Sequence, residues 1–529
     1  MGSNNLTLQE DYWSEFLFTN RDLEFLYNHL LEIETPQTAQ ELAEALIADR
    51  IKKEIYSLSN QKSSEGIRYL PKEKYKTSDV LLFPALGWIK GKVTAVRESN
   101  NPDFPPFEVI TVDFEDTNSM LFASGLEVHQ LNQPLKVDES DPSFKPEIVF
   151  NQYGELITQV ISEKLEATDD LVRIAGRWFP RALLVDINTG HLNLVEAVLD
   201  MSGGGPLPTR ALMDQIELPT DVNSKLTEFS LNLALEEDER FDEVGPSGET
   251  LWFLHRLEPE GVREPPLTLR YREEIEPSSS ADDPLLIQLI SNVIDELEPD
   301  SGKFEKPGQV TISLIYPHWR AGTLPLTKVI RKLFPSAYEA PRVQFRFIDA
   351  NSNEQVSGWV VRSNKYVYGL QKWYRSLDLI PGNYVTISRS EKSGEVIISA
   401  GKKKPSKEWI RTALIGADGG IVFAMLKQLV SGSFDERMAI AIPDVEALDN
   451  LWETGNYSRQ PLETTVKKVM KELAKLNPQG HVHVQELYSA VNLIRRCPPR
   501  PILSILQSMP WSTHMGDLYF RLAETEVEG

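Results

Sequence analysis

The sequence predicts a multidomain α+β protein, and three observations support this fold class. The chain has 529 residues, too many for one hydrophobic core, since a domain usually takes about 100–200 residues. Segments with helical periodicity alternate with groups of short strand-like runs. The charge is also uneven, with a net charge of +11 over residues 303–411, −31 over residues 1–302 and −3 over residues 412–529. We therefore expect several domains with different surface chemistry.

Residues 10–75 are predicted to be helical. Leucines recur at helical spacing before and after residues 35–38, where a proline interrupts the first helix and a threonine can cap the second. A strand-like run follows at 67–70. This order is consistent with a winged helix, although short helices fit many folds.

Residues 78–132 change to short strand-like runs separated by turn clusters at 100–103 and 115–118. Such a pattern predicts a small β-barrel. The run from Val80 to Val93, which contains Gly87-Trp88 and a second glycine, resembles SH3-like and Tudor-like barrels. The resemblance implies binding of proteins or nucleic acid, and a barrel that only spaces its neighbours is the alternative.

Residues 155–270 contain the clearest single module. An apolar helix at 192–199 stops at three glycines, two capped helices follow, and strand-like runs at 241–244 and 250–254 form a hairpin. This order resembles the winged helix, whose third helix commonly enters the DNA major groove. Here acidic residues outnumber basic ones on the third helix and hairpin, so phosphate would be repelled. We expect a protein-docking module, with a purely structural role as the alternative.

Three further segments complete the predicted organisation. Residues 271–302 are rich in serine, proline and acidic residues and are predicted to be a linker that ends in a short helix. Residues 412–455 are predicted to connect domains. Residues 456–529 repeat the order of three helices and a strand, which predicts a second winged helix with a near-neutral charge.

Residues 303–411 form the basic segment, in which strands alternate with short helices. The loop and helix at 316–335, the strand around Trp359 and the helix and turn at 372–387 resemble the B3-like pseudobarrel. That fold occurs in plant B3 transcription factors and in effector domains of some restriction endonucleases. The resemblance implies DNA binding through two arms, at Arg320–Leu324 and 359–375.

The residue pattern of this segment independently favours nucleic acid. Cations neutralise phosphates, and the aromatic side chains between them could stack on bases, whereas a lysine cluster suits backbone contact. The predicted contacts with DNA or RNA are Arg320, Thr323, Arg362, Lys365, Tyr366, Tyr368, Lys372, Trp373, Arg375, Lys402, Lys403 and Lys404. The alternative is that the aromatic side chains form a core and the cations a solvated surface.

No catalytic residue, metal or cofactor is predicted. Gly203–Gly205 lacks the lysine of a phosphate loop and marks a helix end. His481 and His483 form the closest histidine pair, but no cysteine or carboxylate cluster lies near them in the sequence. Cys497 is the only cysteine, so no disulfide can form within the chain.

The predicted location is cytoplasmic, with association with the nucleoid as an option. The first residues lack the basic region and apolar run of a signal peptide. The most apolar stretch, 413–430, is too short and polar to cross a bilayer and is predicted to be a strand or turn that leads into a buried helix. No membrane contact is expected.

Together these features predict a non-enzymatic, DNA-associated adaptor or transcription-type regulator. Residues 303–411 would bind nucleic acid, and the acidic N-terminal half would dock a protein partner or shield the basic domain. A protein-interaction scaffold without nucleic-acid binding is the alternative. A restriction-type nuclease component is less favoured, because carboxylates such as Glu147, Glu155 and Glu163 have no recognisable strand context.

Overall fold

The computed structural model describes residues 12–60, 67–83, 86, 89–99, 106–114, 117–132, 145–218, 223–273, 282–298, 300–303, 306–337, 340–401, 405–416 and 419–523. These segments are mixed α+β, which confirms the predicted fold class at that level. The chain divides into two compact units, Met1–Val185 with Thr220–Phe229, and Asp186–Pro219 with Ser230–Gly529. Each unit is described separately.

The first unit contains a module with the order helix–strand–helix–helix–strand–strand, called module 1. Its elements are α1 (Asn20–Ile33), β1 (Gln37–Thr38), α2 (Ala39–Asn60), α3 (Pro146–Glu166), β7 (Leu171–Ile174) and β8 (Arg177–Pro180). Thr19 and Asp22 form a capping box at the start of α1, and Asp22 also pairs with Arg50 of α2 at 2.6 Å. The first strand, β1, pairs with the last strand, β8.

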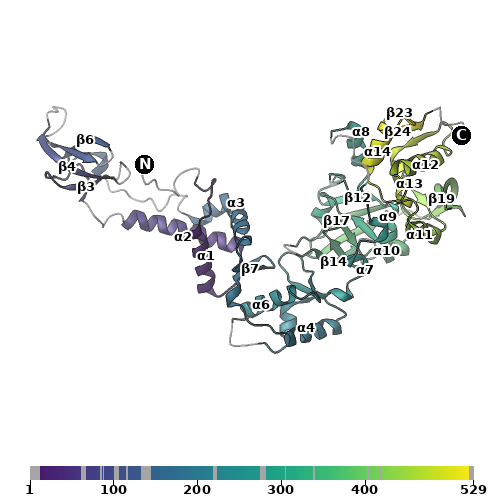
Figure 1. Ribbon diagram of the computed structural model, residues 1–529, viewed down its shortest axis with the longest axis horizontal. Coiled ribbons are helices and arrows are strands. Elements are labelled where there is room, and N and C mark those ends of the chain that lie inside the picture. The colour runs from purple at the N-terminus through teal and green to yellow at the C-terminus, as the bar shows by residue number, and fades with distance from the viewer. Residues whose placement is uncertain are drawn as a thin grey trace. The chain divides into compact units, whose positions relative to one another are not determined.

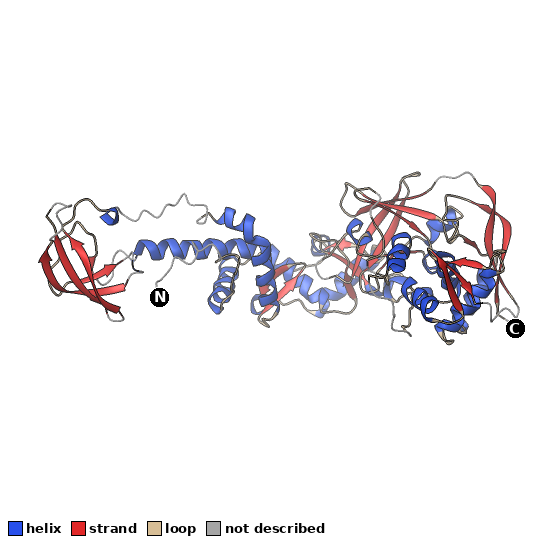
Figure 2. Ribbon diagram, turned by 90° about the horizontal axis from the view of Figure 1, so that it is seen from above, coloured by secondary structure: helices blue, strands red, loops and turns tan. Residues whose placement is uncertain are grey.

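A five-stranded sheet is inserted into module 1 between α2 and α3. Its strands are β2 (Ile67–Arg68), β3 (Val80–Phe83), β4 (Ile89–Glu98), β5 (Glu108–Phe114) and β6 (Thr117–Ser124), and they are drawn in red as one group in Figure 2. The strand-like runs predicted over 78–132 are therefore confirmed as strands. The boundaries predicted at 75 and 155 differ from the structure, since α2 packs against α3 across the insertion.

Module 2 has the same element order as module 1 and belongs to the second unit, apart from the start of α6 up to Phe229. Its elements are α4 (Thr189–Met201), β9 (Leu207–Pro208), α5 (Thr209–Met213), α6 (Ser224–Glu236), β10 (Phe241–Glu243) and β11 (Leu251–Leu254). The first strand, β9, again pairs with the last, β11. Gly205 approaches β11 so closely that a Cβ would lie 2.5 Å from the Trp252 carbonyl oxygen. The helices and hairpin predicted for this segment are confirmed.

The basic segment forms a seven-stranded sheet that curls into a half-barrel beside α9 (Tyr316–Ala321) and α10 (Gln371–Ser376) (Figure 1). Its order is β12-β17-β18-β14-β15-β16-β13, and only the β14–β18 pair is parallel among these neighbours. The bounds are β12 (Gln309–Ser313), β13 (Thr323–Pro325), β14 (Arg342–Asp349), β15 (Gln355–Val361), β16 (Tyr366–Tyr368), β17 (Tyr384–Arg389) and β18 (Glu395–Ala400). Residues on β12, β14, β17 and β18 are more buried at alternate positions, as expected for a sheet with one core face.

Module 3 closes the second unit with the same order a third time. Its elements are α12 (Leu462–Ala474), β22 (His481–His483), α13 (Val484–Ile494), α14 (Pro499–Ser508), β23 (Ser512–Gly516) and β24 (Tyr519–Leu522). The first strand, β22, pairs with the last, β24. The three helices predicted after residue 456 are confirmed.

Between the sheet and module 3 lies a long antiparallel hairpin, β19 (Ser406–Ile415) and β20 (Ile421–Val430). The helix predicted at the end of 413–430 is wrong, because those residues belong to β19 and β20. The predicted boundary at 411 falls inside β19. The remaining elements are α7 (Glu260–Arg263), α8 (Pro284–Asn292), β21 (Ile440–Ala441), α11 (Val445–Thr454) and the 3₁₀ turns Gln130–Asn132, Arg181–Leu183, His255–Leu257, Leu267–Leu269 and Ile330–Leu333.

The described part of the predicted linker is packed rather than extended. Helix α8 contributes Leu286 and Leu289 to the core shared with module 3. Downstream of it, Asp295 binds Arg496 through two hydrogen bonds of 2.5 and 2.9 Å, and Glu296 binds the same guanidinium at 2.8 Å. All three side chains are buried. The acidic residues of this segment therefore neutralise arginine inside the protein.

Within the described segments, no helix combines the length and apolar character needed to cross a bilayer.

Candidate nucleic-acid interface

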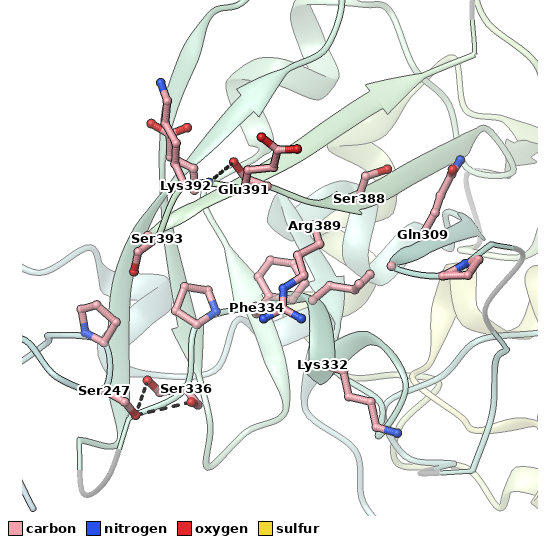
Figure 3. A pocket seen from close by; sticks show the side chains of 18 residues that line it. Ser247, Gln309, Lys332, Phe334, Ser336, Ser388, Arg389, Glu391, Lys392 and Ser393 are labelled. Carbon is pink, nitrogen blue, oxygen red and sulfur yellow. Dashed lines mark hydrogen bonds between the residues drawn. The ribbon is translucent and has the colours of Figure 1, made fainter.

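The basic segment borders a polar groove of about 890 Å³, called the serine groove. Strands β12, β17 and β18, the turn at 330–336 and the loop between β10 and β11 of module 2 enclose it. Its charged and hydroxyl-bearing lining residues are Lys332, Arg389, Lys392, Glu391, Glu395, Ser247, Ser336, Ser388, Ser390 and Ser393. Figure 3 shows the groove from close by.

One wall of the serine groove is the tight turn between β17 and β18. Ser390 Oγ accepts a hydrogen bond of 3.1 Å from the Lys392 backbone N–H. Gly394 completes the turn with a φ of 70°, a conformation that favours glycine. The turn therefore projects Lys392 and Ser393 from the end of the sheet (Figure 3).

The opposite wall joins the basic sheet to module 2. The backbone N–H of Ser247 donates a hydrogen bond of 2.6 Å to the Ser336 carbonyl oxygen, and the Ser247 hydroxyl donates to the same oxygen at 3.0 Å. Further along, the Gln344 N–H donates to the Val244 carbonyl oxygen at 2.9 Å. The hairpin loop of module 2 is thus fixed to the sheet that carries the groove.

The lining of the serine groove contains three cations and two carboxylates, an excess of one positive charge that favours an anion. Lys332, Arg389 and Lys392 are exposed, and none of the three forms an ion pair with a described residue. Of the two carboxylates, Glu395 lies 3.9 Å from Arg346, whereas Glu391 is exposed. Cations and hydroxyl donors can bind phosphate oxygens directly. Phe334, the aromatic residue of the lining, is buried and offers no face on which a base could stack.

The predicted first arm is engaged within the protein. Arg320 forms a two-pronged interaction with Asp449, at 2.8 Å from Nε and 2.8 Å from Nη2. Thr323 is fully buried, and its hydroxyl lies 2.8 Å from His318 Nδ1. Thr323 is therefore closed to a ligand, whereas Arg320 is 32% exposed and lines a pocket of about 400 Å³ together with its partner Asp449. The loop predicted over 317–326 is wrong in part, because residues 317–321 belong to helix α9 and Thr323–Pro325 form strand β13.

Two aromatic side chains of the second arm, Trp373 and Tyr366, are core residues, which corrects their assignment as a stacking surface. Trp373 is 2% exposed and donates to Asp349 at 2.6 Å, and Tyr366 is 1% exposed and donates to the Gly261 carbonyl oxygen at 2.8 Å. Tyr368 is half-buried against Gly261. Buried rings cannot stack on bases without a change of fold.

The cations predicted to bind nucleic acid differ in their exposure. Arg362 is half-buried and donates to the Ala340 carbonyl oxygen at 2.8 Å, while Lys365, Lys372 and Arg375 are exposed. Lys402, Lys403 and Lys404 lie outside the described residues.

The sequence analysis did not predict the residues of the serine groove as a site. A usable signal was present at 388–395, where three serines, a glycine and two cations share one turn between strands. The facing turn at 332–336 is distant from residues 388–395 in the sequence, and folding brings the two turns to the same groove.

Three comparisons were made, with protein-family models, curated proteins and solved structures. None found a match. Any function assigned to the chain therefore rests on its own sequence and geometry.

Among the described residues, no group of three or more histidine, cysteine, aspartate or glutamate side chains is arranged to hold a metal ion. His483 is buried and accepts a hydrogen bond from the Gln485 N–H at the start of α13. Burial and the nearby Arg437 lower the pKa of His483 to about 4, so its ring is neutral at pH 7.

Proposed function

We propose that this protein is a non-enzymatic, nucleic-acid-associated adaptor that contacts the phosphate backbone through the serine groove. The observation that carries the proposal is the position of three exposed cations, Lys332, Arg389 and Lys392, on one groove within the basic segment, none of which forms an ion pair with a described residue. Such contacts release counterions but do not read sequence. Intracellular nucleic acid is the partner that fits. DNA is the preferred partner, and RNA is compared with it in the experiment described below.

The arrangement of the modules supports this proposal. All three have the order helix–strand–helix–helix–strand–strand, with the first strand paired to the last, which resembles the winged helix. The curled seven-stranded sheet resembles the B3-like pseudobarrel, and the inserted five-stranded sheet resembles an SH3-like barrel. These likenesses are to folds common in nucleic-acid-associated proteins, and fold alone does not establish function.

The proposal is tested with full-length protein that carries Lys332→Glu, Arg389→Glu and Lys392→Glu. Mobility-shift titrations with duplex DNA and with RNA at low salt should show binding by the unaltered chain and at least about a tenfold loss in the variant. The affinity of the unaltered chain should fall with salt at a logarithmic slope of roughly −2 to −3, as expected for two or three phosphate contacts.

A matched control is Lys365→Glu, Lys372→Glu and Arg375→Glu, which changes the charge equally at exposed positions of the same segment outside the groove lining. This control should bind more tightly than the groove variant. Equal losses in the two variants would indicate a response to total charge and would contradict a site at the groove.

A protein-interaction scaffold is a second candidate function, favoured by the burial of Trp373 and Tyr366 and by the pairing of Arg320 with Asp449. It predicts that the unaltered chain binds neither duplex DNA nor RNA at low salt. The same titration therefore separates the two functions.

A further inference from the structure

The β19–β20 hairpin carries exposed apolar side chains on both faces. The register places Trp409, Met425 and Leu429 on one face, and Leu414, Val422 and Leu426 on the other. Trp409 is 62% exposed and Leu429 is 66% exposed. A concentration of apolar surface of this kind commonly marks an interaction site.

One end of the hairpin is buried against module 3. Ala413, Ile421 and Phe423 belong to the core shared with module 3, and α12 contacts β20. The other strand, β19, pairs on its outer edge with β21 at Arg411 and Thr412. The exposed apolar side chains therefore belong to a strand pair whose position is fixed.

The outer edge of β20 is open. In the described part of the chain, β20 pairs only with β19, although it has ten residues and is as long as its partner. An edge strand presents a row of backbone N–H and C=O groups, and proteins usually protect such edges with charges, prolines or bulges. β20 has no proline, its register with β19 has no bulge, and its single charged residue is Lys427.

The geometry points to an added β-strand as the occupant. A helix laid on the hairpin would cover one face and leave the backbone groups of β20 unpaired. A strand in the plane of the sheet pairs with those groups, and its alternating side chains touch the apolar side chains on both faces.

The charges indicate which kind of strand fits. The face that carries Trp409 also carries Lys407 and Lys427, and the Lys427 ammonium lies 5.4 Å from the centre of the Trp409 ring. Arg411 on this face is paired with Glu486 at 2.9 Å, whereas neither lysine forms an ion pair with a described residue. A second copy of β20 would bring a further lysine and no carboxylate.

We propose that the open edge of β20 is a docking site for an extended segment of a partner protein, apolar in character and with carboxylates on the face of Lys427. This interaction is independent of the serine groove.

The test uses full-length protein and a fluorescent peptide of about ten residues, with valine at alternate positions and leucine or glutamate between them. Anisotropy should detect binding, and a peptide with lysine in place of glutamate should bind about tenfold more weakly. Lys427→Glu should reverse this order of preference. Hydrogen exchange should show protection of alternate backbone amides in 421–430 when the glutamate peptide is bound.

Leu429→Glu should weaken binding of the glutamate peptide by at least about tenfold, because it removes an exposed apolar side chain and puts a carboxylate on the face that the carboxylates of the peptide approach. The matched control is Leu194→Glu on α4, where the leucine is 50% exposed, and it should bind like the unaltered chain. Equal thermal midpoints would show that both variants fold.

Three results would overturn the proposal. The first is absence of binding, and the second is binding with equal affinity for the two peptides. The third is a dimer of the unaltered chain in sedimentation that Leu429→Glu dissociates, because a second copy would then occupy the edge.

Discussion

Replacing Arg496 with methionine is expected to lower the free energy of unfolding by about 3–5 kcal/mol, because the change leaves buried carboxylates without their cation. Asp295 and Glu296 both bind the Arg496 guanidinium, and the two aspartate contacts and the glutamate contact are 2.5–2.9 Å long. Tyr488 donates to Asp295 at 2.6 Å, and His318 Nε2 lies 2.8 Å from Glu296. Urea unfolding followed by tryptophan fluorescence measures the loss.

The loss should depend on pH in a defined direction. Burial alone would raise the pKa of Glu296, but Arg496 and His318 hold it well below its usual range. In the unaltered chain, this carboxylate therefore contributes stability above its unfolded pKa, and the contribution is lost as the pH falls. In the variant the Glu296 carboxyl stays buried but loses Arg496, so its pKa should rise and the deficit should shrink as the pH falls.

The control for this prediction is Arg270→Met. Arg270 pairs with Glu264 at 3.4 Å, and both side chains are exposed, at 53% and 72%, so water can replace the lost partner. The expected loss is about 1 kcal/mol. Equal losses at the two positions would contradict a special role for the buried network, as would a deficit in Arg496→Met that does not change with pH.

Much of the secondary structure could be predicted because its signals are local. The leucine spacing that predicts helices before and after residues 35–38 is satisfied by α1 and α2, and the strand-like runs at 241–244 and 250–254 contain β10 and β11. Caps and glycines also act within a few residues, as at Asn188, which caps α4 by accepting from the His191 N–H. The prediction of such elements does not depend on residues that are distant in the sequence.

The organisation of the domains could not be predicted in the same way, because it depends on partners that are distant in the sequence. β1 pairs with β8 across the whole inserted sheet, and Arg496 meets Asp295, about two hundred positions earlier. An acidic segment beside serines and prolines is typical of a flexible linker, and only the presence of Arg496 and Arg500 shows that its carboxylates are internal partners.

The candidate site shows the same limit. Aromatic and cationic residues that interleave along a strand are typical of a nucleic-acid surface, but also of a strand with one buried face. Trp359 lies on such a buried face, because Phe253 of module 2 packs edge-on against it, with ring centres 5.2 Å apart. The serine groove escaped prediction because its two walls come from different turns.

The contact between module 2 and the sheet contains a buried carboxyl pair, and it leads to the second large expected effect. Glu258 is 3% exposed, and Arg342 lies 3.3 Å from one of its oxygens while also pairing with Asp242. No described side chain hydrogen-bonds either Glu258 oxygen with good geometry. Burial and the Asp242 carboxylate raise the pKa of Glu258 to about 8, although Arg342 opposes the rise.

Replacing Glu258 with glutamine is expected to raise the free energy of unfolding at pH 9 by about 1–3 kcal/mol, because it removes a buried charge while keeping the side-chain shape. In the unaltered chain the folded state holds a proton that the unfolded state releases above its ordinary pKa of 4.5. The stability contributed by this group is therefore fully present below pH 4.5, declines as the pH rises and is lost above about 8. The advantage of the variant should be small at pH 5 and largest at pH 9.

Urea unfolding of both proteins at pH 5, 7 and 9 measures this difference. Glu264→Gln is the matched control, because that side chain is 72% exposed and pairs with Arg270 at 3.4 Å, so its effect should stay within about 0.5 kcal/mol at every pH. If Glu258→Gln destabilises the protein equally across this range, Glu258 is an ionised partner of Arg342 rather than a protonated neighbour of Asp242. The direction of the pH dependence therefore decides which charge state holds module 2 on the sheet.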